Sequence, residues 1–82
     1  MMKNHLHLDE PAKYRIQVQG ILGQQWSESM GGLEISVTGS QDQPVTTLTG
    51  ELLDQAALMG VLNGLYSLGY ALLSVEYQSL SS

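Results

Sequence analysis

The stretch from Asp54 to Gly69 constrains this chain most, because it has both the length and the apolar period of a helix. Asp54 suits an N-cap, since its carboxylate can accept hydrogen bonds from the free amides of the first turn. Gly69 suits the left-handed position that follows a helix. The apolar residues between them recur at helical spacing: Ala57, Leu58, Val61, Leu62, Leu65 and Leu68. The sequence therefore predicts a helix over residues 54–68 whose apolar stripe packs against strands.

Four further segments have the composition of strands, and we expect them at residues 14–20, 33–38, 45–50 and 71–77. Alternation is clear in three of them but ambiguous in the segment 45–50, where we place Thr46 and Leu48 on the face away from the helix. The predicted core consists of Tyr14, Ile16, Val18, Leu33, Ile35, Val37, Leu58, Val61, Leu65, Leu68, Leu73 and Val75.

The predicted element order is β-β-β-α-β, which is typical of a two-layer α+β domain. Consecutive strands tend to be neighbours, and the helix then returns the chain so that the last strand lies beside the first. We therefore expect a four-stranded, mostly antiparallel sheet in the order 3-2-1-4 with one helix on one face. The length of 82 residues suits one domain. We assign it to residues 13–78, between a flexible N-terminal tail at 1–12 and a C-terminal tail at 79–82.

The charge distribution argues against several classes of partner. The net charge is −5, and the three basic residues, Lys3, Lys13 and Arg15, all lie in the first fifteen positions. Binding to nucleic acid or to an anionic membrane surface needs a basic face, so we expect neither partner. The chain has no cysteine and no apolar run of the roughly 20 residues that cross a bilayer, and because its first ten residues have no apolar centre we do not expect them to be a signal peptide. We therefore expect a cytoplasmic protein.

No catalytic constellation is apparent, so we expect neither an enzyme nor a bound cofactor. His5 and His7 would point the same way in an extended segment, but no third metal ligand follows, which favours a polar tail over a metal site. Glu34 and Glu76 are predicted to share the polar face of the sheet. They fit either an acid–base pair or, as we favour, a solvated surface.

The outward face of the predicted helix suggests self-association. It carries no charge after Asp54, although an exposed helix face normally does. A small-residue repeat at Ala56, Gly60 and Gly64 would let another helix approach closely. We therefore predict a homodimer or a protein partner, and we expect Gly60→Glu to block the contact. The alternative is an uncharged exposed face that binds nothing. The predicted interface residues are Ala56, Met59, Gly60, Asn63, Tyr66 and Ser67.

A second hypothesis is a small-ligand sensor or a minor enzyme. It requires a pocket near Tyr14 and Trp26, or one formed across an oligomer interface. Trp26 also fits a structural role, in which its ring plugs the open end of the core and its indole nitrogen stays near water. A concave apolar cavity with convergent polar groups beside Trp26 would favour this second hypothesis.

Several segments together resemble a family of small uncharacterised bacterial proteins found in actinobacteria and cyanobacteria. The resemblance covers about residues 14–77 and rests on Tyr14-Arg15-Ile16-x-Val18-x-Gly20, Trp26-Ser27, Thr49-Gly50-x-Leu52-x-Asp54-Gln55-Ala56-Ala57-Leu58-x-Gly60 and Leu72-Leu73-Ser74-Val75. It implies a single cytosolic domain with no established activity. The resemblance also implies that relatives commonly carry a histidine at the position of Met59 and one or two basic residues later in the helix. The absence of these residues here argues against a catalytic role for that position.

Overall fold

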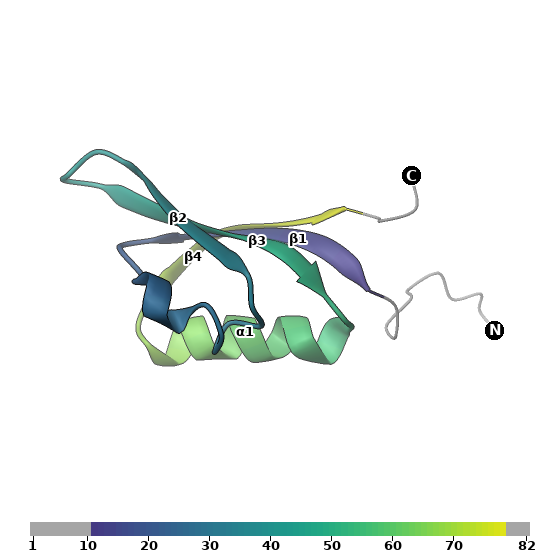
Figure 1. Cartoon of the computed structure of the whole chain (residues 1–82). Coiled ribbons are helices and arrows are strands. Elements are labelled where there is room, and N and C mark those ends of the chain that lie inside the picture. The colour runs from purple at the N-terminus through teal and green to yellow at the C-terminus, as the bar shows by residue number, and fades with distance from the viewer. Residues whose placement is uncertain (1–10, 79–82) are drawn as a thin grey trace.

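The computed structural model describes residues 11–78, which form a four-stranded sheet with a helix below it (Figure 1). Its elements are β1 Ala12–Gln19, the 3₁₀ turn η1 Gln24–Trp26, β2 Glu34–Gly39, β3 Pro44–Leu52, α1 Gln55–Ser67 and β4 Ala71–Gln78. The predicted α+β class and element order are confirmed. Residues 1–10 and 79–82 of the predicted tails, His5 and His7 among them, lie outside the described residues. Ala12 does not belong to the tail, because it begins β1 and is buried.

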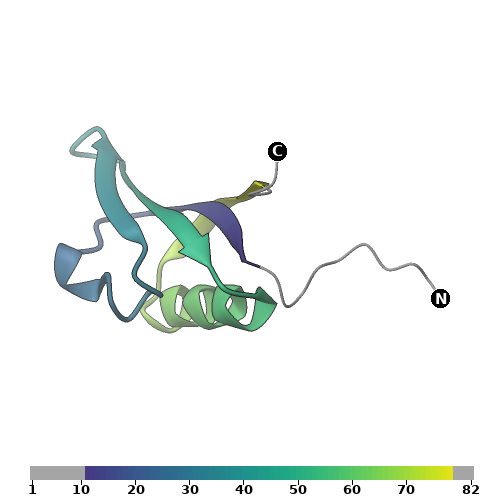
Figure 2. The ribbon, with the colours of Figure 1, turned by 45° about the vertical axis from the view of Figure 1, so that its right-hand side comes forward.

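The sheet has the order β2-β3-β1-β4 with every pairing antiparallel, so β2 and β3 exchange places relative to the predicted order 3-2-1-4. β1 pairs with β3 along its whole length, and β4 pairs with the other side of β1. The reason lies in the connections. Residues 40–43 make a tight turn that keeps β2 beside β3, whereas the connection 20–33 is too long to force β1 and β2 together. η1, within that connection, lies on the same side of the sheet as α1 (Figure 2).

Both predicted ends of the helix are confirmed. Asp54 caps the N-terminus, since its Oδ1 accepts a hydrogen bond from the Ala57 amide at 2.9 Å. At the other end Gly69 adopts φ +90°, a conformation that a side chain would oppose. The Gly69 amide donates to the Tyr66 carbonyl at 2.9 Å, and the Tyr70 amide to the Leu65 carbonyl at 3.0 Å. These two bonds form a Schellman motif, so sequence-local chemistry sets both helix ends.

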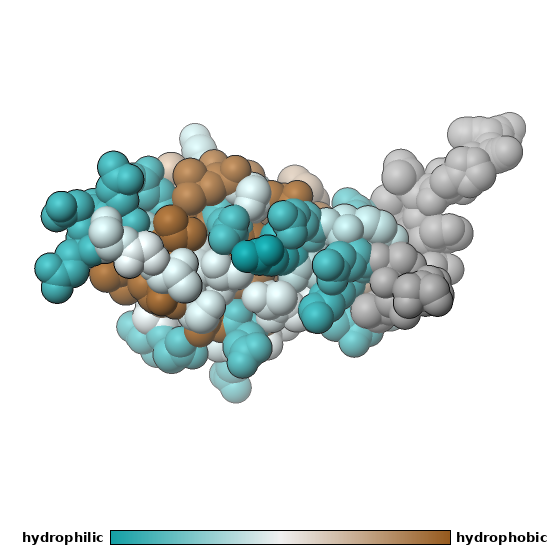
Figure 3. All heavy atoms as spheres, turned by 90° about the horizontal axis from the view of Figure 1, so that it is seen from above, coloured by the Kyte–Doolittle hydropathy of each residue, from teal (hydrophilic) through white to brown (hydrophobic). Residues whose placement is uncertain are grey.

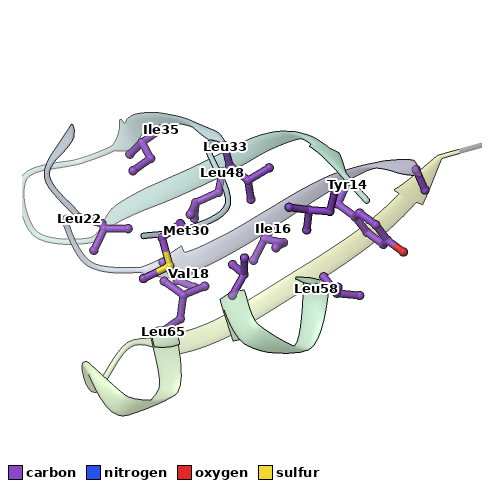
Figure 4. Packing of buried hydrophobic residues seen from close by; sticks show 13 residues of the cluster. Tyr14, Ile16, Val18, Leu22, Met30, Leu33, Ile35, Leu48, Leu58 and Leu65 are labelled. Carbon is purple, nitrogen blue, oxygen red and sulfur yellow. The ribbon is translucent and has the colours of Figure 1, made fainter. Parts of the chain in front are cut away.

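The core lies between the sheet and α1, and Figure 4 shows its side chains running from Tyr14 at one end to Leu22 at the other. Predicted core residues that are buried are Tyr14, Ile16, Val18, Leu33, Ile35, Leu58, Val61 and Leu65. The prediction is wrong for Val37, Leu68, Leu73 and Val75, which are 39–51% exposed. Val37, Leu73 and Val75 lie on the two edge strands, and Leu68 is the C-cap of α1, so α1 does not cover these positions fully.

The predicted facing of β3 is also wrong. Leu48 pairs with Ile16 on one side and with Ile35 on the other, and opposed residues in an antiparallel pair share a face. Leu48 therefore lies on the helix side and is fully buried, as is Thr46, which pairs with Val18. The alternation in this segment did not distinguish its faces, because β-branched threonines occupy both of them.

The connection 20–33 supplies core residues that the predicted strands lack. Leu22 and Met30 are buried in the same cluster, together with Ala12, Leu48 and Leu52. The buried Thr46 hydroxyl holds the start of this connection, because it donates to the Gly20 carbonyl at 2.6 Å and accepts from the Leu22 amide at 3.1 Å. The connection therefore forms part of the layer that covers the sheet.

Candidate interaction surface

β4 is an edge strand, paired with β1 on one side and with no strand of residues 11–78 on the other. Along such an edge, alternate backbone N–H and C=O groups point outward and are free to pair with another strand. β4 also carries four large apolar side chains in exposed positions: Leu72 at 52%, Leu73 at 51%, Val75 at 39% and Tyr77 at 59%. Natural edges are usually short or charged, so this long apolar edge indicates a partner.

These four side chains all lie on the helix side of the sheet. Val75 pairs with Ile16 and Tyr77 with Tyr14, both of which are core residues of β1. The register then slips by one residue, a β-bulge, so that Leu72 pairs with the buried Val18 and Leu73 has no direct partner. Alternation from Val75 places Leu73 on that side as well. α1 therefore covers the centre of the sheet but leaves the helix side of β4 partly open.

One stripe of α1 faces this uncovered strip. Gln55, Met59, Leu62 and Tyr66 are spaced i, i+4, i+7 and i+11, so they share one side of the helix. The Gln55 side-chain amide donates to the Tyr14 hydroxyl at 3.0 Å. The Tyr14 ring in turn lies 5.6 Å, centroid to centroid, from Tyr77 of β4. The stripe therefore lies on the β4 side of α1. Two of its residues are exposed to solvent, Met59 by 49% and Tyr66 by 82%.

We call these six residues the β4–α1 surface: Met59, Tyr66, Leu72, Leu73, Val75 and Tyr77. No charged residue occurs between Gln55 and Val75. The nearest charge on β4 is Glu76, which pairs in register with Arg15 on the opposite face of the sheet. The β4–α1 surface is thus an apolar corner made of a strand edge and a helix flank, without charged groups of its own.

The other edge of the sheet, at β2, is different. The Gln24 side-chain amide donates to the Ile35 carbonyl at 2.6 Å, and the Ser27 hydroxyl donates to the Leu33 carbonyl at 2.7 Å. The connection 20–33 therefore occupies backbone acceptors of β2 and of the residue that leads into it. Within residues 11–78 no side chain makes an equivalent bond to the backbone of β4. β2 also exposes a single large apolar side chain, Val37.

The face of the sheet away from α1 is polar and is cross-linked by its own side chains. Ser74 Oγ donates to Gln17 Oε1 at 3.1 Å, and Gln17 Nε2 donates to Thr47 Oγ1 at 3.3 Å. Arg15 Nη1 lies 3.6 Å from Glu76 Oε1, with both side chains about half exposed. Figure 3 looks on to this face and shows hydrophilic and intermediate residues over much of it, with apolar residues toward its upper edge and at its lower left.

The family model described as Domain of unknown function (DUF8691) matches residues 13–76. The chain belongs to this family. The match runs from the second residue of β1 to Glu76 in β4, so the DUF8691 domain includes every residue of the core cluster except Ala12. Membership of an uncharacterised family of small domains is thereby confirmed, whereas the bacterial source stays a prediction. No curated protein and no solved structure matches the chain significantly.

The predicted interface residues of the DUF8691 domain divide into two groups. All six are exposed: Ala56, Met59, Gly60, Asn63, Tyr66 and Ser67. Met59 and Tyr66 belong to the β4–α1 surface, while the other four are small or polar and lie further round α1, away from the sheet. Gly64 has an internal role, because a Cβ there would lie 3.3 Å from the Met30 methyl group. Sequence reasoning missed the apolar residues of β4 because it assigned two of them to the core.

The two residues of the predicted pocket lie apart. Tyr14 is buried beside Gln55 at the N-terminal end of α1. Trp26 is half-buried in η1, and the same connection reaches α1 at Gly64, nine residues or roughly 14 Å along the helix from Gln55. A shallow groove of about 260 Å³ lies elsewhere, and neither Tyr14 nor Trp26 lines it. Its lining residues are Ile21, Val37, Thr38, Gly39, Ser40, Gln41 and Pro44.

The candidate chemical groups are also separated. Glu34 and Glu76 share the polar face as predicted, but they lie on the two edge strands with Thr49 and Arg15 between them in register. At the usual strand spacing they are roughly 14 Å apart, too far for a carboxylate pair to share one proton. Within residues 11–78 no three His, Asp or Glu side chains form a group that holds a metal ion. No helix in the described part of the chain is long and apolar enough to cross a membrane.

Proposed function

We propose that the DUF8691 domain is a small, non-enzymatic, self-associating interaction module that acts in the cytoplasm, and that the β4–α1 surface is its contact. One observation carries the proposal. Within residues 11–78, one side of the edge strand β4 has no strand paired to its backbone, and β4 carries four large apolar side chains that are 39–59% exposed. Pairing with another strand would satisfy the backbone and remove these side chains from water in one step.

The apolar area supports a reversible contact rather than a permanent one. Fully burying a large apolar side chain contributes about 1.5–3 kcal/mol, so completing the burial of a half-exposed one contributes about 1 kcal/mol. Six residues on each of two copies then contribute roughly 12 kcal/mol before costs. Association costs about 4–15 kcal/mol in lost freedom of motion. The balance favours a dimer that dissociates on dilution.

The sequence around the surface supports the same function. The solvent side of a helix usually carries charges that keep a monomer soluble, but α1 has none after Asp54. A domain of this size buries little surface alone and is only marginally stable, so a second copy would add to its stability. The alternative of a ligand pocket formed by Tyr14 and Trp26 has less support, because these residues lie toward opposite ends of α1.

Sedimentation equilibrium over a range of concentrations tests the proposal. We expect the parent protein to change from monomer to dimer as its concentration rises. Val75→Lys places a charge in the centre of the surface and should shift this transition to at least tenfold higher concentration, roughly 1.4 kcal/mol of binding energy. Val37→Lys is the matched control, because it makes the same change on the other edge strand and should leave the transition in place.

Two results would overturn the proposal. One is a parent protein that stays monomeric at the highest attainable concentration. The other is an equal loss of association in the Val75→Lys and Val37→Lys variants, which would show that charge on either edge disturbs the domain in general. Circular dichroism of both variants establishes that each is folded before their masses are compared.

A further inference from the structure

The arrangement of β4 also indicates what pairs with it. On the basis of the self-association proposed above, we propose that β4 pairs with β4 of a second copy. The two strands run antiparallel and are related by a two-fold axis at Val75. The two four-stranded sheets then become one continuous sheet in the order 2-3-1-4-4-1-3-2. The contact closes on itself, since the same edge is used by both copies.

The geometry of antiparallel pairing determines where the helices go. Opposed residues in an antiparallel pair point to the same face, so the two-fold axis that relates two such strands is perpendicular to the sheet. Both copies of α1 therefore lie on one face of the joined sheet. The stripe with Met59 and Tyr66 lies on the β4 side of α1, so the two stripes face each other across the axis. The apolar side chains of β4 are then enclosed between the two helices.

The sequence of β4 selects the register. With Val75 opposite Val75 of the second copy, Tyr77 lies opposite Leu73, and Ser74 lies opposite Glu76. Apolar residues then meet on the helix side, while a hydroxyl meets a carboxylate on the polar face. This register keeps the two Glu76 side chains apart.

Neighbouring registers are less favourable. Centring the pair on Glu76 places two carboxylates directly opposite each other, which is destabilising. Centring it on Ser74 would bring Leu72 opposite Glu76 of the second copy, but the β-bulge puts Leu72 on the helix side whereas Glu76 lies on the polar face, so regular pairing in that register stops at Leu73. In both alternatives, as in the register at Val75, each residue lies opposite a residue that is an even number of positions away in the sequence, which the two-fold axis requires. The side chains therefore distinguish the three registers.

A contact between β4 and β2 of another copy is the competing arrangement. It would leave a free β4 at one end and a free β2 at the other, and so would build an open-ended polymer. β2 is also the poorer partner, because Gln24 and Ser27 already bond the Ile35 and Leu33 carbonyls there. The pairing of β4 with β4 leaves those bonds intact.

Disulfide trapping tests the register, since the chain has no cysteine of its own. Opposed Cα atoms in an antiparallel pair are about 4.5–5.5 Å apart, which is within the range of a disulfide. Under mild oxidation at a concentration where the parent is dimeric, Val75→Cys should convert mostly to a covalent dimer. Val37→Cys, on the other edge strand, is the matched control and should stay mostly monomeric on a non-reducing gel.

A second pair of variants examines the same register away from the axis. Leu73→Cys and Tyr77→Cys lie opposite each other across the proposed contact, but neither lies opposite itself. We expect a mixture of the two to form a mixed disulfide several-fold faster than either variant forms a dimer with itself. Equal rates in the mixture and in the separate samples would contradict the register at Val75.

The outcomes separate this proposal from the proposed function. A parent that dimerises by sedimentation, while Val75→Cys cross-links no faster than Val37→Cys, overturns the β4 pairing but leaves self-association standing. A parent that is monomeric throughout overturns both. A mixed disulfide between Val75→Cys and Val37→Cys, formed in preference to the Val75→Cys dimer, shows the β4–β2 polymer and also overturns the pairing. Sedimentation of each cysteine variant under reducing conditions establishes that the substitution itself has not dissociated the dimer.

Discussion

The methyl group of Met30 lies 3.3 Å from the position that a Cβ of Gly64 would occupy. This contact joins the connection 20–33 to one flank of α1 and is possible because Gly64 has no side chain. The opposite flank carries Gln55, which bonds Tyr14 beside β4. The two contacts together orient α1 about its axis, so that Met59 and Tyr66 lie on the β4 side.

Gly60 and Gly64 differ in their surroundings, and alanine substitutions should show it. A Cβ at Gly60 meets nothing within 4 Å, so Gly60→Ala should stabilise the monomer by about 0.5–1 kcal/mol through helix propensity and chain entropy. Gly64→Ala should stabilise the monomer by less than Gly60→Ala does, because the Met30 side chain must move to make room for the new methyl group. Urea unfolding at low protein concentration measures the difference. A larger gain at Gly64 than at Gly60 would contradict the contact with Met30.

Leu65 in α1 and Leu68, the C-cap of α1, lie one turn apart but differ in burial. Leu65→Ala, at a buried site, should lower the free energy of unfolding by about 2–5 kcal/mol, and Leu58→Ala should behave similarly. Leu68→Ala removes a side chain that is 41% exposed, so it should cost about 1 kcal/mol or less. Urea unfolding of the variants provides the comparison. Equal costs at the two positions would mean that the helix end is packed differently.

Thr46 is a buried polar residue whose hydroxyl has two backbone partners. Thr46→Val keeps the shape but leaves the Gly20 carbonyl and the Leu22 amide without that partner, so it should destabilise the domain by about 1–3 kcal/mol. Thr38→Val, at an exposed position of β2, is the control and should change stability by about 0.5 kcal/mol or less. Thermal unfolding of both variants measures the effect; a Thr46→Val variant as stable as the parent would show that water replaces the hydroxyl.

Tyr14 should make stability depend on pH in the alkaline range. Burial raises the pKa of Tyr14 above 10.0, as does the nearby Tyr77, while the hydrogen bond from Gln55 acts in the opposite direction. The folded state therefore holds this proton more tightly than the unfolded state does. Its contribution is complete below pH 10.0 and is lost as the pH rises through the raised pKa.

Unfolding at about pH 9 and about pH 11 measures this effect. The free energy of unfolding should fall between these values in the parent, and Tyr14→Phe should reduce the fall. Tyr66→Phe is the control, because the Tyr66 side chain is 82% exposed and lies outside the core. At a protein concentration where the domain is monomeric, it should leave the pH dependence close to that of the parent. If the free energy of unfolding falls as much in Tyr14→Phe as in the parent, groups other than Tyr14 cause the loss of stability at alkaline pH.

Gly60→Glu distinguishes the two candidate contacts on α1. Gly60 is exposed and lies away from β4, so the proposed pairing of β4 with β4 should tolerate a glutamate there. A dimer formed through the outer face of α1, as the small-residue repeat at Ala56, Gly60 and Gly64 suggested, should instead dissociate. Sedimentation of this variant beside Val75→Lys is the measurement. Loss of the dimer in Gly60→Glu alone would move the contact from β4 to the outer face of α1.

Much of the local structure was predictable from the sequence. The observed strand boundaries lie within two residues of the predicted ones, and the helix cap at Asp54 and its end at Gly69 are as expected. These features depend on residues close together in the chain. Capping needs a carboxylate within reach of the next turn, and the end of the helix needs a residue that tolerates positive φ.

The candidate site was predictable only in part. The exposure of Met59 and Tyr66 followed from the helical period, because that period determines which residues share a face. The exposure of Leu73 and Val75 did not, since the same alternation describes a covered strand and an edge strand. Nothing in the sequence of β4 shows whether a helix lies over it.

The sequence by itself determined the elements, their ends and the single helix-forming stripe, because hydrogen bonding and backbone preference act over a few residues. Tertiary structure decided the strand order, the buried face of β3 and the edge that stays open. These depend on contacts between residues far apart in the chain, such as Leu48 with Ile16, Met30 with Gly64, and Thr46 with Leu22. Such contacts compete for the same core volume, and only the packed domain determines which segments occupy it.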